Sequence, residues 1–163
     1  MADKVAKLQL KIANQDLMLV DSKYVICYCI SADCAMGKGV VVPIVKKYIG
    51  VKNACSEFVK NNDSNDAVGQ AFRYSCESGT VYNLFSKKIF RHKAGSGVTV
   101  NQYHSQLQSC LEDMKNQMLQ NGEKYLAMPK IACGLDRCNW EDVERIIRHV
   151  FGETGIEILI CVV

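Results

Sequence analysis

The sequence predicts an α/β domain in which a largely parallel or mixed β-sheet is covered by helices on both faces. Two observations carry this prediction. Apolar runs of strand length alternate along the chain with stretches of helical periodicity. Most of these runs are apolar throughout, which is typical of strands buried on both faces. At 163 residues, with no internal repeat or linker, the chain is expected to form a single domain over residues 1–163.

Two strands are expected first. Residues 7–12 alternate between polar and apolar side chains, with Leu8, Leu10 and Ile12 on one face. Residues 24–30 form a near-continuous apolar run and therefore predict a strand buried on both faces.

A short helix and a hairpin follow. The helix is expected over residues 42–49, because Pro43 fits a first helical turn and Gly50 fits a left-handed stop. Residues 69–76 and 80–86 are typical of two strands joined by a tight turn.

The second half of the chain predicts a long helix and a strand. Apolar side chains recur at intervals of three and four residues before Asn121 and Gly122 end the pattern; they are Tyr103, Leu107, Leu111, Met114 and Met118. Residues 124–131 then predict another buried strand.

The last helix is expected to begin at Asn139, which can cap it together with Asp142 three residues later. Its apolar face comprises Val143, Ile146, Ile147, Val150 and Phe151. Residues 157–163 predict the final strand.

Composition limits the function classes. The content of 48% hydrophobic and 23% charged residues is that of a globular protein, and the longest apolar stretches are too short to cross a bilayer. Nine cysteines without a CxxC pair or a histidine at zinc-ligand spacing predict reduced, buried thiols and no metal. We therefore expect an intracellular protein of the cytoplasm, the nucleus or both, without membrane association. A net charge of +3 does not by itself predict nucleic-acid binding.

Two expected strand-to-helix junctions, residues 31–39 and 132–139, are rich in small residues. Glycines let backbone N–H groups approach a ligand, so each junction could hold phosphate oxygens, and two such loops suggest a diphosphate. For either loop alone, a plain tight turn is the favoured interpretation. The Walker pattern and the dinucleotide-binding GxGxxG pattern are both absent.

Three segments resemble the macrodomain family: CISADCAMGKGVVV, LFSKK and MPKIACGLDRCNWEDV, followed by a helix and a terminal apolar strand. The likeness covers nearly the whole chain and is greatest to the branch of terminal ADP-ribose protein glycohydrolases. It implies a three-layer α/β/α sandwich with a central mixed sheet, whose cleft holds ADP-ribose, and a reaction that needs no cofactor.

The resemblance also assigns roles. LFSKK places Lys87 at the position of the lysine that attacks the anomeric carbon, and CGLD places Asp136 at the acid/base aspartate. A positioned amine can displace a carboxylate from the sugar through a covalent adduct, and a nearby carboxylate can move the proton. Lysine is inert while protonated, so Lys87 has to lose its proton, through partial burial or a neighbouring cation such as Lys88. Without the resemblance, Lys87 is a solvated hairpin lysine and Asp136 a turn acid.

Binding residues carry over by position. The resemblance assigns Asp16, Leu17 and Val163 to adenine. It assigns the phosphate and ribose loops to Ser31, Gly37, Gly39, Lys130, Ile131, Ala132, Cys133, Gly134 and Leu135. Ala132 stands where the branch has glycine, so its methyl group would crowd the backbone approach. Lys38 stands where a small residue is expected, and either strengthens phosphate binding or points to solvent.

Two functions remain open. The first is an enzyme that removes ADP-ribose from glutamate or aspartate of modified proteins, with O-acetyl-ADP-ribose, ADP-ribose 1″-phosphate and ADP-ribosylated nucleic acid as related substrates. The basic segment at residues 86–93 would tolerate an anionic carrier such as DNA. The second is a non-catalytic module that binds ADP-ribose. A monomer is expected in either case.

Overall fold

The computed structural model describes residues 6–163. Residues 1–5, the start of the charged stretch MADKVAKLQL, lie outside the described residues. In the described range, none of the helices has the length and apolar character needed to span a bilayer.

Residues 6–163 contain a six-stranded sheet in the order β1-β8-β7-β2-β4-β3. The strands are β1 (Gln9–Asn14), β2 (Val25–Ser31), β3 (Ala71–Cys76), β4 (Gly79–Lys87), β7 (Tyr125–Met128) and β8 (Glu157–Val162). Neighbours pair in parallel, except that β3 and β4 pair antiparallel as a hairpin. The prediction of a mixed central sheet is therefore confirmed.

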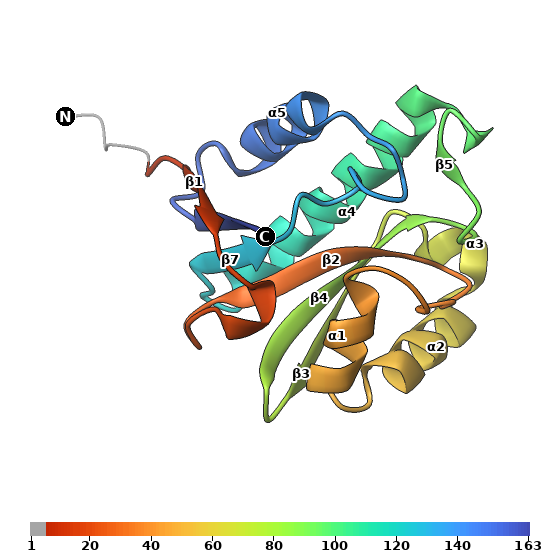
Figure 1. Cartoon of the computed structure of the whole chain (residues 1–163), viewed down its shortest axis with the longest axis horizontal. Helices are drawn as coiled ribbons and strands as arrows, with labels where there is room; N and C mark the ends of the chain where they lie inside the picture. The colour runs from red at the N-terminus through yellow and green to blue at the C-terminus, as the bar shows by residue number, and fades with distance from the viewer. Residues whose placement is uncertain (1–5) are drawn as a thin grey trace.

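Helices cover both faces of this sheet, which gives the predicted three layers (Figure 1). On one face lie α1 (Val41–Lys47), α2 (Val51–Asn62) and the short α3 (Ser64–Ala67). On the other face lie α4 (Val100–Gln120) and α5 (Trp140–Phe151). A 3-10 turn, η1 (Leu17–Leu19), follows β1, and the two-residue strands β5 (Lys93–Ala94) and β6 (Gly97–Val98) precede α4.

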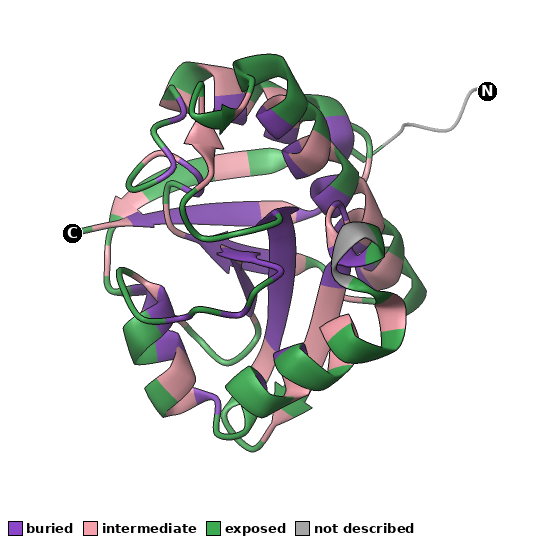
Figure 2. Ribbon diagram, turned by 90° about the vertical axis from the view of Figure 1, so that its right-hand side faces the viewer, coloured by how far each residue is buried: buried purple, intermediate pink, exposed green. Residues whose placement is uncertain are grey.

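The sheet separates two apolar clusters, and its central strands β2 and β4 are buried along most of their length (Figure 2). The stripe predicted for the long helix is fully buried in the first cluster, against β4 and α5. Ile44, Val51 and Cys55 from α1 and α2 lie in the second cluster, on the opposite face. Burial of these side chains is what fixes the helices on the sheet.

Some details differ from the sequence predictions. Helix α2 was not predicted, although Val51, Cys55 and Phe58 recur at helical spacing; a left-handed Gly50 separates it directly from α1. Ile12, expected on the same face as Leu8 and Leu10, is 48% exposed, because this edge strand is covered incompletely. Asn139 does cap α5, accepting from the Glu141 N–H; Asp142 instead lies 3.3 Å from Arg145.

Parallel pairing brings the carboxyl ends of β2, β4 and β7 to the same edge of the sheet, where ligands bind in open α/β folds. One irregularity lies at this edge. The register shifts between Ile30 and Ser31, so that β4 carries one extra residue, Ser86, just before Lys87. Such β-bulges redirect side chains, and they are frequent next to active sites.

Candidate active site

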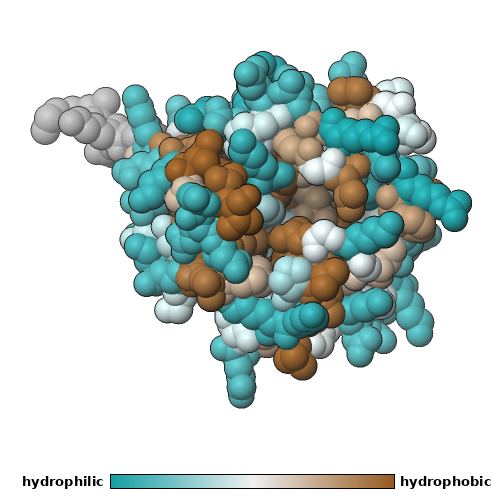
Figure 3. All heavy atoms as spheres, viewed as in Figure 1, coloured by the Kyte–Doolittle hydropathy of each residue, from teal (hydrophilic) through white to brown (hydrophobic). Residues whose placement is uncertain are grey.

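A cleft of about 590 Å³ opens at the carboxyl ends of β2, β4 and β7. Its volume is within the range of pockets that hold small molecules and cofactors. Two loops form its walls: the first loop, residues 31–40, and the second loop, residues 129–138. Figure 3 shows this side of the molecule hollowed near its centre, with hydrophobic residues around the hollow.

Most of the predicted site residues line this cleft: Ser31, Gly37, Gly39, Lys87, Lys130, Ile131, Ala132, Gly134, Leu135 and Asp136. Cys133 belongs to the second loop but is not among the lining residues. Asp16, Leu17 and Val163 lie outside the lining as well.

Lys87 ends β4 and projects its ammonium into a set of three acceptors. Its Nζ donates to the carbonyl oxygens of Phe90 and His92, at 2.9 and 3.0 Å, and to the carboxylate of Asp136. Three donated bonds use all three hydrogens of an ammonium group. In this resting arrangement Lys87 is therefore protonated, and its lone pair is not available for attack.

Asp136 receives two donors on its two carboxylate oxygens. Oδ1 accepts from Lys87 and Oδ2 accepts from the hydroxyl of Tyr103. The backbone oxygen of Asp136 also accepts from the N–H of Ala94 at 3.1 Å. These contacts fix a side chain that would otherwise depend on an irregular loop for its position.

Lys87 and Asp136 are the only charged residues classed as buried within residues 6–163, at 7% and 8% exposure. Burying two charges is costly, and proteins retain such pairs chiefly where they serve a purpose. The pair lies at a cleft rather than in the core, so a bound ligand can reach it.

The contacts of Lys87 differ from the sequence expectation in one respect. Partial burial or a neighbouring cation is expected to remove the lysine proton; Lys87 is buried, but the adjacent Lys88 is exposed, and its backbone oxygen accepts from the Asp33 N–H at 3.1 Å. The groups around the Lys87 nitrogen are all acceptors. Among these acceptors, the Asp136 carboxylate is the one group that can take a proton.

The first loop is held by Asp33, whose carboxylate accepts from the Ser31 hydroxyl, the Ala35 N–H at 3.1 Å and the Phe90 N–H at 2.9 Å. This carboxylate ties the loop to the segment that follows Lys87. Further along, the N–H groups of residues 37, 38 and 39 donate no hydrogen bond within residues 6–163. Unpaired N–H groups in a glycine-containing loop are suited to anionic oxygens.

The second loop has the same property: the N–H groups of residues 134, 135 and 136 donate no hydrogen bond in the described part of the chain. A Cβ atom added at Gly39 would lie 3.8 Å from Leu135, so the two loops approach each other across the cleft. The structure thus presents two sets of free backbone donors on facing walls.

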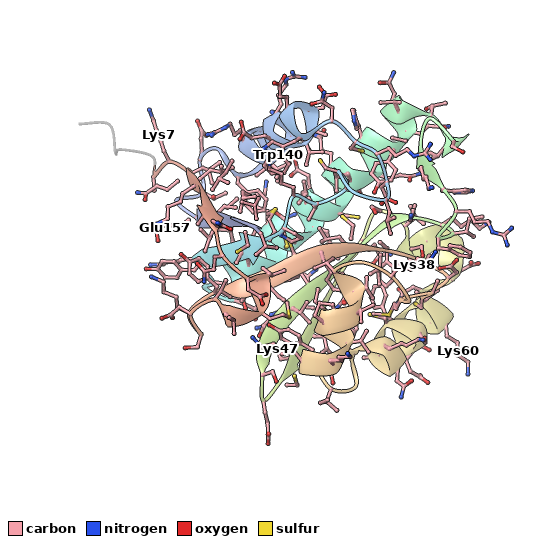
Figure 4. The ribbon with its side chains drawn as sticks, in the orientation of Figure 1. Lys7, Lys38, Lys47, Lys60, Trp140 and Glu157 are labelled. Atoms are coloured by element: carbon pink, nitrogen blue, oxygen red, sulfur yellow. The ribbon has the colours of Figure 1, made fainter. Side chains whose placement is uncertain are left out.

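Ala132 adopts φ +64°, a left-handed conformation that costs an L-residue about 1–2 kcal/mol. The glycine expected at this position would adopt it without strain. Lys38 is exposed at the rim of the first loop (Figure 4). The Nζ of Lys130 lies 5.7 Å from the centre of the Trp140 ring.

The residues assigned to adenine have other local roles. Asp16 caps η1, with Oδ1 accepting from the Met18 N–H at 2.8 Å, whereas its Oδ2 has no partner within residues 6–163. Leu17 is buried in the apolar cluster beneath α1 and α2, and Val163 is 100% exposed after β8.

The cysteines are free thiols, six of them buried and three half-buried. Cys29 lines the cleft, and burial, reinforced by Asp136, raises the pKa of its thiol, which therefore stays protonated. Residues 6–163 contain no cluster of three or more metal-ligating side chains.

Sequence reasoning assigned no site role to Tyr103, Ser86, Asp33 or Phe90. Tyr103 appeared only as part of the buried stripe of the long helix, and its hydroxyl was the one signal that separated it from the aliphatic members. Asp33 accepts from Phe90, and Ser86 contacts Tyr103. These partners are too far apart in the sequence for a local pattern to predict the contact.

Comparisons with known proteins agree with this architecture. A model of the Macro domain matches residues 30–147. The chain is 36% identical over 135 residues to the Homo sapiens protein named ADP-ribose glycohydrolase OARD1, covering 83% of this chain and 79% of that protein.

Two solved structures show the same fold. The macrodomain of Thermus aquaticus DarG has a TM-score of 0.74 at 18% identity, over 96% of this chain and 99% of that one. The Thermosipho africanus DarTG structure in complex with ADP-ribose has a TM-score of 0.76 at 17% identity, over 94% of this chain and 41% of that one.

Proposed function

The chain belongs to the macrodomain family, and we propose that it is an ADP-ribosyl hydrolase that releases ADP-ribose from glutamate or aspartate side chains of modified proteins. One observation carries the proposal: the buried contact between the Lys87 ammonium and the Asp136 carboxylate at the base of the cleft. A nucleophile and its base within hydrogen-bond reach are the signature of covalent catalysis. The relative named ADP-ribose glycohydrolase supports this reaction class.

The reaction begins with proton transfer. Asp136 Oδ1 takes a proton from the Lys87 ammonium, which frees the lone pair of Nζ. Nζ then leaves the Phe90 and His92 carbonyl oxygens and attacks the anomeric carbon of the distal ribose. A C–N bond forms as the bond to the acceptor carboxylate breaks, and the carboxylate departs with the electron pair.

Water completes the cycle. It adds to the anomeric carbon as the C–N bond breaks, so that the hydroxyl stays on ADP-ribose and one proton goes to Nζ. Lys87 is thereby restored as an ammonium, and Asp136 loses its extra proton to solvent. The first proton transfer joins two groups that are already in contact.

The two loops would bind the diphosphate. Residues 37–39 and 134–136 offer free backbone N–H groups on opposite walls, and Lys38 adds a positive charge at the rim. Backbone donors preorganised around an anion are favourable because they need no side-chain ordering. The distal ribose would then extend toward Lys87.

The carrier of the ADP-ribose extends the proposal. Exposed Lys88 and Arg91 lie beside the reactive lysine. Basic side chains at this end are compatible with an anionic carrier, including nucleic acid, and O-acetyl-ADP-ribose would fit the same chemistry. We also propose that the protein acts as an intracellular monomer.

A second function is favoured by one observation. Because all three hydrogens of the Lys87 ammonium are bonded in the resting arrangement, the chain could bind ADP-ribose without turnover, as a reader module. Both functions require the same cleft. They differ in whether substrate binding releases Lys87 from its acceptors.

Turnover on a defined substrate tests the proposal. A protein carrying ADP-ribose on glutamate is incubated with wild type, Lys87→Ala, Asp136→Ala and the exposed-lysine control Lys60→Ala, and free ADP-ribose is measured by mass spectrometry. We expect release by wild type and the control, and none by the two site variants. Calorimetry with ADP-ribose checks that each variant retains a folded cleft.

Each outcome has a distinct meaning. Tight ADP-ribose binding without release by wild type would establish the reader and reject the enzyme. Release together with an ADP-ribose adduct in the intact mass, abolished in Lys87→Ala, would support the covalent route. Absence of ADP-ribose binding would overturn both functions.

A further inference from the structure

We propose that Tyr103 is a positioning residue for the reaction, which holds the carboxylate of Asp136 so that Oδ1 faces the Lys87 nitrogen. The inference rests on the proposed function and extends it to a residue on another element, the first turn of α4. Its basis is the contact between the Tyr103 hydroxyl and Asp136 Oδ2.

The direction of this hydrogen bond follows from chemistry. Burial, with smaller contributions from Cys29 and Asp136, raises the pKa of the Tyr103 phenol, so the hydroxyl keeps its proton. Asp136 faces an ammonium on its other oxygen and is therefore a carboxylate that only accepts. Tyr103 must be the donor.

Ser86 extends the chain of contacts. The Ser86 hydroxyl lies 3.1 Å from the Tyr103 hydroxyl oxygen. Because Tyr103 donates its hydroxyl hydrogen to Asp136, Ser86 is the donor in this second hydrogen bond. Ser86 is the extra residue of the β4 bulge, next to Lys87. Hydrogen bonds thus link Ser86 to Tyr103, Tyr103 to Asp136 and Asp136 to Lys87. The first and the last of these residues are neighbours at the end of β4.

Tyr103 is held more rigidly than the loop it contacts. A capping box between Thr99 and Gln102 fixes the start of α4, and the Tyr103 N–H donates to the Thr99 oxygen at 2.9 Å. The Tyr103 side chain is fully buried. Asp136, by contrast, lies in an irregular loop with a left-handed residue, Arg137, directly after it. A site on a loop needs such support from a rigid element.

A buried tyrosine also needs a partner for its hydroxyl simply to be stable in a core. The chain offers a matched control for that structural role. Tyr82 is equally buried, and its hydroxyl likewise donates to a carboxylate, that of Glu123. Glu123 also pairs with Arg73 at 2.8 Å, and neither Tyr82 nor Glu123 lines the cleft.

The experiment compares Tyr103→Phe with Tyr82→Phe in the full chain, using the glutamate-linked substrate. Both changes remove one hydroxyl from a buried ring, so similar losses of thermal stability are expected. We expect Tyr103→Phe to lower kcat by about 10- to 100-fold, the effect of a hydrogen bond to a charged group, with KM changed less than about 3-fold. Tyr82→Phe should keep the wild-type kcat.

Ser86→Ala gives an intermediate case. It removes a neutral donor one step further from Asp136, so we expect kcat to fall by only about 3-fold. Both Ser86→Ala and Tyr103→Phe should bind ADP-ribose as tightly as wild type in calorimetry, because the phosphate loops are untouched.

The results separate this inference from the proposed function. If wild type turns over and Tyr103→Phe loses no more kcat than Tyr82→Phe, the positioning role is overturned and the enzyme stands. A rise in KM at constant kcat would overturn it too. If wild type does not turn over, the proposed function fails and the inference fails with it.

Discussion

The reactive pair and the residues assigned to adenine are held in opposite ways. Lys87 and Asp136 are buried. The three ammonium hydrogens of Lys87 and both carboxylate oxygens of Asp136 are hydrogen-bonded to neighbouring groups. Asp16 is exposed and keeps one carboxylate oxygen free, and Val163 is fully exposed. The difference fits the proposed roles, with fixed geometry where bonds would change and spare hydrogen-bonding capacity where a ligand would only be held. Changes at the first set should act on kcat, and changes at the second on affinity.

Lys87→Arg should give the largest effect. Arginine keeps the positive charge and can donate to Asp136, but it is always protonated and cannot attack carbon. We expect kcat to fall by more than about 10⁴-fold, with loss of the covalent adduct, while ADP-ribose affinity stays within a few fold. Single-turnover release and intact mass measure the two effects. Retained turnover in Lys87→Arg would mean that the lysine acts only through its charge.

Asp136→Asn should follow. The amide fits the same space but cannot take the lysine proton, and removing an acid/base group costs about 10²- to 10⁴-fold in rate. Rates at rising pH provide the check, because hydroxide can replace a missing base for Lys87. Partial recovery at high pH supports proton removal by Asp136; a flat profile at the residual rate would instead indicate a role in orientation.

The fold class was predictable from the sequence because buried side chains recur at the period of a helix or a strand. The stripe from Tyr103 to Met118 repeats as a helix requires, and all five of its apolar side chains are fully buried. Periodicity shows which side chains share a face, but it does not show what covers that face. Ile12 on the edge strand β1 therefore fits the strand pattern and is still exposed. Helix α2 was missed because Gly50, a good stop for α1, was not also recognised as the start of the next helix.

The site was predictable only in part for a related reason. Lys87 and Asp136 came from a family resemblance, since neither has a local pattern that distinguishes it from a surface lysine or a turn acid. Their supports are further removed: Tyr103 is 33 residues from Asp136, and Asp33 is 57 residues from Phe90. Such contacts exist only once the sheet and α4 have come together.

Asp16→Asn tests whether the exposed residues assigned to adenine act on affinity rather than on kcat. Asparagine caps a helical turn as well as aspartate does, so η1 should persist, while the charge of the free oxygen is lost. We expect ADP-ribose affinity to fall by about 10-fold with kcat unchanged, as measured by calorimetry and steady-state rates. Asp21→Asn is the control, because Asp21 makes the same local contact, accepting from the Lys23 N–H at 2.9 Å. A fall in kcat for Asp16→Asn would break the division between the two sets.

Ala132→Gly should give the smallest effect on function and a gain in stability. If contacts from α4 and β4 hold the reactive pair, rather than the backbone of the second loop, relaxing the loop at φ +64° should leave kcat unchanged. Relief of left-handed strain, less the added entropy of glycine in the unfolded chain, should stabilise the protein by about 0.5–1 kcal/mol. Thermal unfolding should show this as a rise of about 1–4 °C in Tm. Ala54→Gly within α2, where glycine costs about 1 kcal/mol, should shift Tm in the opposite direction. A drop in kcat for Ala132→Gly would show that the strained backbone itself helps to position Asp136, because glycine would then have released it.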